Sequence, residues 1–221
     1  MTVLHLADEG EAADLAAFLS RLLHYDRSAA VRLQAAGTAL AVFGRPPSFE
    51  VLAIRAARLA KPYEDGLDVT LDVTVSAGEL LESVDETAAT AAVPGAVTGP
   101  PWAGVLPPRG GWRAEPGLPE PRELRGLVAA SVAEFRSRTE ELAPGSRTRA
   151  EFDRIGREIW SRTVARTPLP VRAVHAAQSL GFLRGDEQGL FSSGAWLRLR
   201  TPYGSVAVRR TGLGALGLSV R

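Results

Sequence analysis

Residues 195–210 read AWLRLRTPYGSVAVRR, and this stretch decides much of the expected fold. On both sides of TPYG, apolar residues alternate with arginine or small residues, which is the period of a β-strand with two different faces. The proline and glycine of TPYG are typical turn residues. The stretch therefore predicts a β-hairpin.

The register of this hairpin decides where its arginines lie. If Leu199 pairs with Val206, the leucines and valines share one face, and Arg198, Arg200 and Arg209 line the other. A slip by one residue would mix the two faces. The turn leaves the register open, because proline cannot adopt the positive φ that two-residue hairpin turns require. A basic face is thus expected only in the first register.

Three helices are expected before the hairpin. Apolar residues repeat at helical spacing over 124–135 and again over 152–164, and a Pro-Gly pair separates the two stripes. A third helix is expected from Pro170 to about Leu180, because proline suits the first helical turn and a glycine follows the last one.

The order of three helices and a hairpin, over about residues 120–210, resembles that of winged helix-turn-helix domains. The resemblance implies that the third helix, PVRAVHAAQSLGFL, enters the major groove of DNA and that the hairpin serves as the wing. The alternative is a helical subdomain that packs on the sheet and leaves its arginines in solvent. The candidate nucleic-acid contacts are Arg172, His175 and Gln178 on the helix, and Arg198, Arg200 and Arg209 on the hairpin.

The first half of the chain predicts an α+β arrangement. Asp8 and Ser76 are plausible N-caps of two helices, and strand-like runs lie between them. Residues 66–76, GLDVTLDVTVS, alternate cleanly between apolar and polar. Residues 51–54 are apolar on both faces, which places them centrally in a sheet. We therefore expect a mostly antiparallel sheet flanked by helices.

Half of the 28 residues from Pro94 to Pro121 are proline or glycine, and we call this segment the strap. Proline lacks the N–H donor, so the strap favours extended and turn conformations. Burying a large aromatic side chain stabilises a protein by a few kcal/mol, so Trp102 and Trp112 are expected to dock on the rest of the chain. The alternative is a partner-binding element containing Trp102, Arg109 and Trp112, because Trp and Arg are enriched at interface hot spots.

Charge divides the chain at the strap. Residues 1–119 hold 9 basic and 15 acidic side chains, whereas residues 120–221 hold 17 basic and 10 acidic ones. The two halves can attract each other or a second copy of the chain, or the basic half can meet a polyanion. The expected domains are an acidic α+β domain (1–93), the strap (94–121) and a basic helical subdomain with the hairpin (122–221), with one shared core or two.

Several chemistries are not expected from this sequence. There is no cysteine, and the three histidines lie far apart, so no metal site is predicted. Asp68 and Asp72 share a strand face and could in principle hold a cation, but a solvated strand face is the favoured interpretation. GLGALG, at 212–217, matches a dinucleotide-binding pattern, but no helix of sufficient length follows it. We therefore expect no cofactor and no catalytic residues.

These observations leave three hypotheses for function. The first is a non-catalytic, intracellular protein that binds a protein partner or itself, in a regulatory role. The second is a nucleic-acid-binding regulator that uses the helix at 170–182 and the hairpin at 195–210. The third is an enzyme or small-ligand binder with a pocket under the strap.

Composition also bears on the compartment. Only one of the 26 basic residues is lysine, an arginine excess that is typical of GC-rich bacteria. The N-terminus is acidic and lacks a signal-peptide pattern, and no apolar run is long enough to span a membrane. A cytoplasmic protein is therefore expected.

Overall fold

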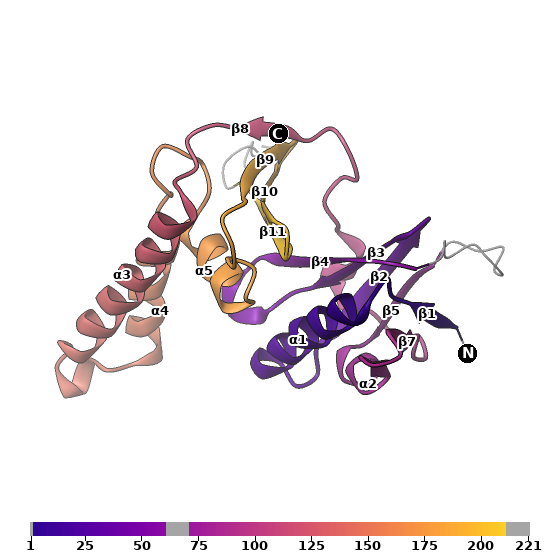
Figure 1. Ribbon diagram of the computed structural model, residues 1–221. Coiled ribbons are helices and arrows are strands. Elements are labelled where there is room, and N and C mark those ends of the chain that lie inside the picture. Colours follow the sequence, from indigo (N-terminus) through magenta and orange to yellow (C-terminus); the bar gives the residue numbers. More distant parts are fainter. Residues whose placement is uncertain (1, 61–70, 211–221) are drawn as a thin grey trace, which may run out of the picture.

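An eight-stranded antiparallel sheet forms the centre of an α+β fold (Figure 1). The computed structural model describes residues 2–60 and 71–210. The strand order is β5-β2-β3-β4-β11-β10-β9-β8. The strands of this sheet are β2 (Ala30–Ala36), β3 (Ala39–Gly44), β4 (Leu52–Arg58), β5 (Asp72–Ser76), β8 (Arg113–Glu115), β9 (Gly189–Ser193), β10 (Trp196–Thr201) and β11 (Gly204–Arg209).

The sheet is continuous across the strap because β4, from the first half, pairs with β11, from the second. Ile54, Ala53 and Leu52 lie opposite Ser205, Val206 and Ala207. As expected, the apolar run around β4 is central, and it is buried on both faces. One hydrophobic core consequently contains residues from both halves.

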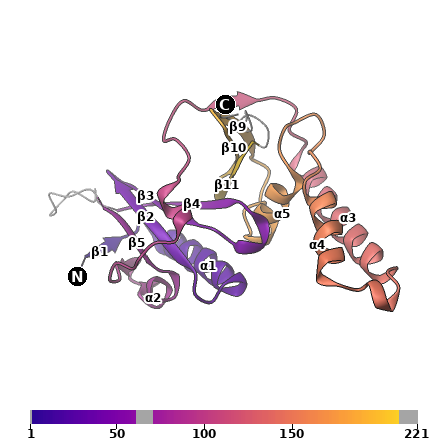
Figure 2. The ribbon, with the colours of Figure 1, turned by 180° about the vertical axis from the view of Figure 1, so that it is seen from behind.

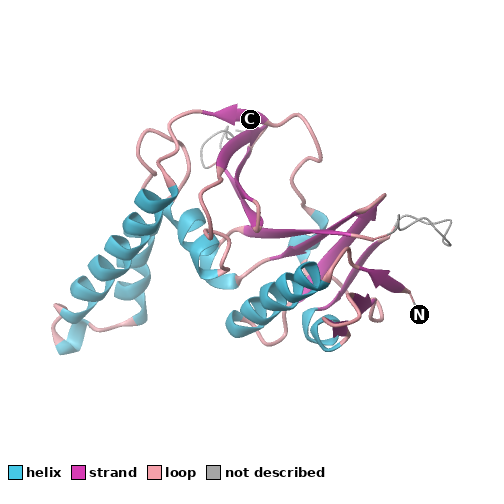
Figure 3. Ribbon diagram, in the orientation of Figure 1, coloured by secondary structure: helices cyan, strands magenta, loops and turns pink. Residues whose placement is uncertain are grey.

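Helices cover one face of the sheet (Figure 3). The helix α1 (Glu9–Tyr25) begins where expected, since the Asp8 carboxylate accepts a hydrogen bond from the backbone N–H of Glu11 at 2.8 Å. Likewise, Ser76 caps α2 (Ala77–Glu82). Leu15, Phe18, Leu19 and Leu22 form the buried side of α1.

The second half contributes three helices, as the apolar periodicity predicts. They are α3 (Pro121–Glu140), α4 (Arg149–Trp160) and α5 (Val171–Ser179). The α5 helix packs on the same sheet face as α1, and Gly181 follows it with a φ of 73°, which glycine adopts without strain. Figure 3 shows α3 and α4 projecting away from the sheet as an antiparallel pair.

A second, smaller sheet lies beside α1 and α2. Its strands run in the order β1-β7-β6, and pattern analysis of the sequence did not find them because each is only two or three residues long. The three strands are β1 (Val3–His5), β6 (Val84–Asp85) and β7 (Thr90–Ala92). Of the predicted strand at 66–76, the described part forms β5, while Asp68 and the GLGALG stretch lie outside the described residues.

The hairpin has the register that separates its two faces. Leu199 lies opposite Val206, so the leucines and valines face the helices and the arginines face away from them. The hairpin is not a free wing, however, because β11 also pairs with β4, and β10 with β9. Three helices and a hairpin follow in the expected order, but both hairpin strands lie inside the sheet, and β11 is one of its two central strands.

The strap crosses the sheet face opposite the helices, from one edge to the other. It starts at β5, where the backbone N–H of Val97 donates to the carbonyl of Thr74 at 2.9 Å. The short helix η2 (Pro101–Gly104) then lies over β3 and β4, and Figure 2 shows it in front of these strands. Near the opposite edge, the Ser193 hydroxyl donates to the carbonyl of Gly110, and the strap continues into β8.

A buried arginine joins α1, β4 and the turn of the hairpin. The side chain of Arg55 is only 5% exposed and pairs with Glu11 at 2.8 Å and with Asp14 at 3.4 Å. It also donates to the backbone carbonyl of Tyr203 at 3.0 Å. Loss of Arg55 would leave the largely buried Glu11 carboxylate with only the exposed Arg58 as a partner, and breaking a buried ion pair in this way is strongly destabilising in proteins.

We predict that Arg55→Met lowers the free energy of unfolding by about 3 kcal/mol in urea denaturation. Arg58→Met is the matched control, because Arg58 also pairs with Glu11, at 2.9 Å, but its side chain is 71% exposed. Arg58→Met should lower the free energy of unfolding much less than Arg55→Met does, because solvent screens exposed ion pairs. Equal losses for the two variants would contradict the assigned role of Arg55.

Candidate functional site

The strap side of the sheet carries a cluster of arginine and aromatic side chains. Cross-strand pairing places Arg198 beside Phe191 on β9, and Trp196 beside Arg209 on β11. Arg200 follows Arg198 by two residues and therefore lies on the same face. We call Trp112, Phe191, Trp196, Arg198, Arg200 and Arg209 the strap-side surface.

Arg198 lies at the centre of this surface in an unusual environment for a charged group. Its guanidinium donates to the Ser205 hydroxyl at 2.9 Å and lies 5.7 Å from the ring centre of Trp112. Its Nε is buried, and no described residue accepts a hydrogen bond from it. The pKa of Arg198 is lowered, first by burial and then by the positive charge of Arg200. The charge of Arg198 is therefore poorly compensated.

Two further arginines of the strap-side surface are exposed. The guanidinium of Arg209 lies 5.3 Å from the ring centre of Trp196, a cation–π contact that leaves the charge open to solvent. Arg200 is exposed on the same face of the hairpin, two residues beyond Arg198 and away from Arg209, which lies opposite Trp196. None of the ion pairs between described residues includes Arg198, Arg200 or Arg209. These charges thus remain available to an external anion.

The strap residues expected to contact a partner have different environments. Trp102 is half-buried against a small apolar cluster that includes Phe43 and Ile54, in agreement with the expected docking of the strap. Trp112 is also half-buried, and its indole N–H donates to the carbonyl of Pro108 at 3.0 Å. Arg109, by contrast, is exposed. Only Arg109 of the three is fully available on the surface.

Asp72 belongs to an ion pair at the edge of the same face. The Arg32 guanidinium donates to it at 2.7 and 2.9 Å, and this bidentate bond is the main reason why the pKa of Asp72 is lowered. Arg32 also donates to the carbonyl of Ala103 in the strap. Asp72 therefore anchors Arg32 under the strap, and Arg109 adds a smaller lowering of its pKa.

The predicted recognition-helix residues lie on the other side of the sheet. The α5 helix packs against the apolar face of β11, whereas Arg198, Arg200 and Arg209 point to the opposite face. Within α5, Gln178 is exposed and Arg172 is half-buried. The Nε of Arg172 is buried, and no described residue accepts a hydrogen bond from it. The structure therefore does not bring the two predicted groups of contacts together into one surface.

His175 is part of an aromatic stack that ties α5 to α4. Its ring is stacked on Trp160 with a centroid distance of 4.5 Å, and it meets Phe49 edge-on at 5.0 Å. Burial lowers the pKa of His175, because the protonated ring would lose its hydration. His175 therefore packs between aromatic side chains and is not placed to contact nucleic acid together with the hairpin arginines.

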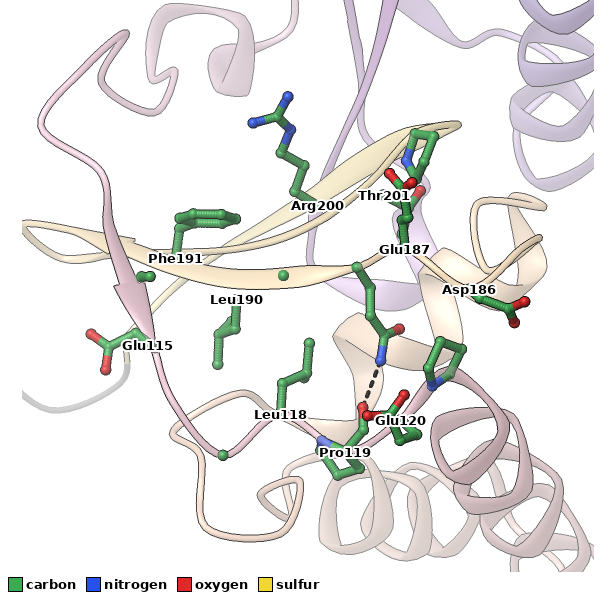
Figure 4. Close-up of a pocket in the computed structure, with 16 residues that line it drawn as sticks. Glu115, Leu118, Pro119, Glu120, Asp186, Glu187, Leu190, Phe191, Arg200 and Thr201 are labelled. Carbon is green, nitrogen blue, oxygen red and sulfur yellow. Dashed lines mark hydrogen bonds between the residues drawn. The ribbon is translucent and has the colours of Figure 1, made fainter.

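A pocket of about 810 Å³ opens at the edge of β9, where β8 leaves the sheet (Figure 4). Leu118 and Leu190 contribute apolar walls, and residues 114, 115 and 117–121 of the strap form one side. Glu187 and Asp186 line the end of the pocket away from Phe191, as Figure 4 shows. Phe191 and Arg200 of the strap-side surface also line this pocket, so the two features adjoin each other.

Two members of the strap-side surface were missed by reasoning from the sequence. Phe191 lies on a strand that was not predicted, because Gly189 and two serines weaken its apolar pattern. Trp196 was within the predicted hairpin, and its alternation with Arg198 already placed it on the basic face. Only the second of these could have been found from the sequence.

In the described part of the chain, no group of three or more histidine, aspartate or glutamate side chains could hold a metal ion. Within the same residues, no helix has the length and apolar character required to cross a membrane.

Two family profiles match the chain, and their boundary lies in the strap. Residues 1–104 match a family described as Domain of unknown function (DUF8010), and residues 107–213 match one described as Domain of unknown function (DUF8185). No curated protein and no solved structure matches. The β4–β11 pairing therefore joins two matched regions into one sheet.

We predict that stability rises with pH as His175 loses its proton. With a lowered pKa in the folded state, the unfolded chain binds more protons, so the free energy of unfolding falls as pH drops below the unfolded value of about 6.5. His175→Gln should flatten this dependence in urea denaturation between pH 7.5 and 5.5. If the free energy of unfolding of the variant still fell between pH 7.5 and 5.5 by as much as that of the wild type, His175 would not be the group responsible.

Proposed function

We propose that the protein is a non-catalytic binding protein and that nucleic acid binds to the strap-side surface. The observation that carries this proposal is the group of three arginines, Arg198, Arg200 and Arg209, on one face without an ion pair to any described carboxylate. Phosphates are the natural partners of such guanidinium groups, which bind them through two parallel N–H donors.

The energetics of Arg198 support an external anion. A partly buried charge is destabilising unless it is paired, and here the neighbouring charge of Arg200 adds repulsion. A phosphate between these two arginines would relieve both effects at once. Binding would thus compensate an unfavourable arrangement of the free protein.

The aromatic side chains of the same surface favour nucleic acid over a simple anion. Trp112 and Trp196 each lie against an arginine, and both are half-buried. Arginine and aromatic side chains together are typical of surfaces that hold a phosphate backbone and the bases attached to it. The α5 helix has no part in this proposal.

A second candidate is a protein partner that binds the exposed part of the strap. Val105 is 47% exposed and Arg109 is exposed, and Pro107-Pro108 lies between them. Proline-rich extended segments lose little conformational entropy when they bind aromatic-lined grooves. A second copy of the chain could bind in this way.

We predict that the full-length protein binds single-stranded oligonucleotides with an affinity that falls as salt rises, measured by fluorescence anisotropy. Arg200→Ala/Arg209→Ala should reduce the slope of log K against log salt by about 1.4, since each lost phosphate contact removes about 0.7. Both residues are exposed, so the fold should be unaffected.

The matched control is Arg136→Ala/Arg166→Ala. These two arginines are also exposed, and they lie outside the strap-side surface, so the net charge changes equally. The proposal requires the control to bind with the slope of the wild type. Equal losses in both variants would show that only net charge matters, and an absence of binding by the wild type would refute the proposed function.

A further inference from the structure

Phe191 has an orientation that a neighbouring glycine makes possible. Gly189 precedes it by two residues on β9 and lies on the same sheet face. A Cβ atom at Gly189 would stand only 2.8 Å from Cε2 and 3.1 Å from Cζ of the Phe191 ring. The ring therefore occupies the space that any other residue at position 189 would fill, and Figure 4 shows it lying along the strand.

The Phe191 side chain lines the pocket together with Arg200, a positively charged residue of the neighbouring strand. Phe191 is half-buried, and it lies opposite Arg198 across the β9–β10 pairing. Arg200 lies opposite Gly189 and extends away from the strand in Figure 4. The neighbouring strand thus places two arginines on the face that carries the aromatic ring, and Arg200 is exposed.

We propose that Phe191 is a base-stacking platform and that the ligand of the strap-side surface is single-stranded. This inference rests on the proposed function and deepens it. One base would stack on the Phe191 ring while its phosphate binds Arg200 and Arg198. Bases of a duplex are stacked on one another and cannot reach such a ring, whereas unpaired bases can.

The charges around Phe191 also give the strand a direction. Four acidic residues, Glu115, Glu120, Asp186 and Glu187, line the adjoining pocket, and they would repel phosphates there. Arg209 lies on the other side of Arg198, beside Trp196. The backbone would therefore run from Phe191 past Arg198 toward Arg209, and Trp196 would be the next aromatic side chain along it.

The sharpest test changes the orientation of the ring and not its chemistry. In Gly189→Ala the new methyl group forces the Phe191 ring away from the strand, because the Cβ of alanine would lie only 2.8 Å from Cε2 at the far end of the ring. Gly189 is not among the glycines with positive φ, so alanine fits its backbone. A second variant, Phe191→Ala, removes the aromatic ring completely.

We predict that Phe191→Ala weakens binding of dT and rU homopolymers about tenfold and Gly189→Ala about fivefold, measured by anisotropy. Duplex DNA of the same length should bind weakly and equally to all three proteins. Phe191→Tyr should restore the wild-type affinity, because it keeps the ring. Phe152→Leu is the control for loss of an exposed aromatic side chain elsewhere, and it should bind as the wild type does.

The outcomes separate this inference from the proposed function. If single strands bind and respond to Arg200→Ala/Arg209→Ala but not to either platform variant, the stacking platform is refuted and the phosphate-binding surface stands. If inorganic polyphosphate displaces the strands as well as an oligonucleotide of equal charge, the bases contribute nothing, and the inference also fails. If the wild type binds no nucleic acid, both proposals fail.

Discussion

The pairing of β4 with β11 is the constraint on which the rest of the structure depends. Only three residue pairs form it, yet it joins strands that lie about 150 residues apart in the chain. Because β11 is fixed to β4, the hairpin becomes part of the central sheet, and α5 packs on the same apolar face as α1. The buried Arg55 reinforces this junction by reaching Glu11 and the carbonyl of Tyr203.

This position of the hairpin gives its two faces different roles. The leucines and valines lie under the helices, so their burial contributes to the core. The arginines cannot share that environment, and the period of a strand places all of them on the opposite face. The same alternation that builds the core therefore concentrates positive charge on the strap side, at Arg198, Arg200 and Arg209.

Local patterns in the sequence predicted the elements better than their arrangement. The caps of α1 and α2, the third helix and the face-separating register of the hairpin follow from spacing and from side-chain chemistry within a few residues. The β4–β11 pairing does not, because nothing local specifies which strand lies beside which. For the same reason, the resemblance to a winged helix suggested a shared surface for α5 and the hairpin, whereas the sheet separates them. The position of Phe191 depends on Gly189, whose role emerges only when the strand is known.

The composition of the strap explains how the positive face can stay available. Between Pro94 and Trp112 the only charged side chain is that of Arg109. A cover rich in aspartate or glutamate would have formed ion pairs with the arginines below it and removed their charge from reach. Prolines and glycines instead offer carbonyl groups, such as that of Ala103 to Arg32, while Trp102 covers the apolar middle of the sheet. The strap thus shields the apolar part of this face and leaves the charge of Arg200 and Arg209 open to solvent.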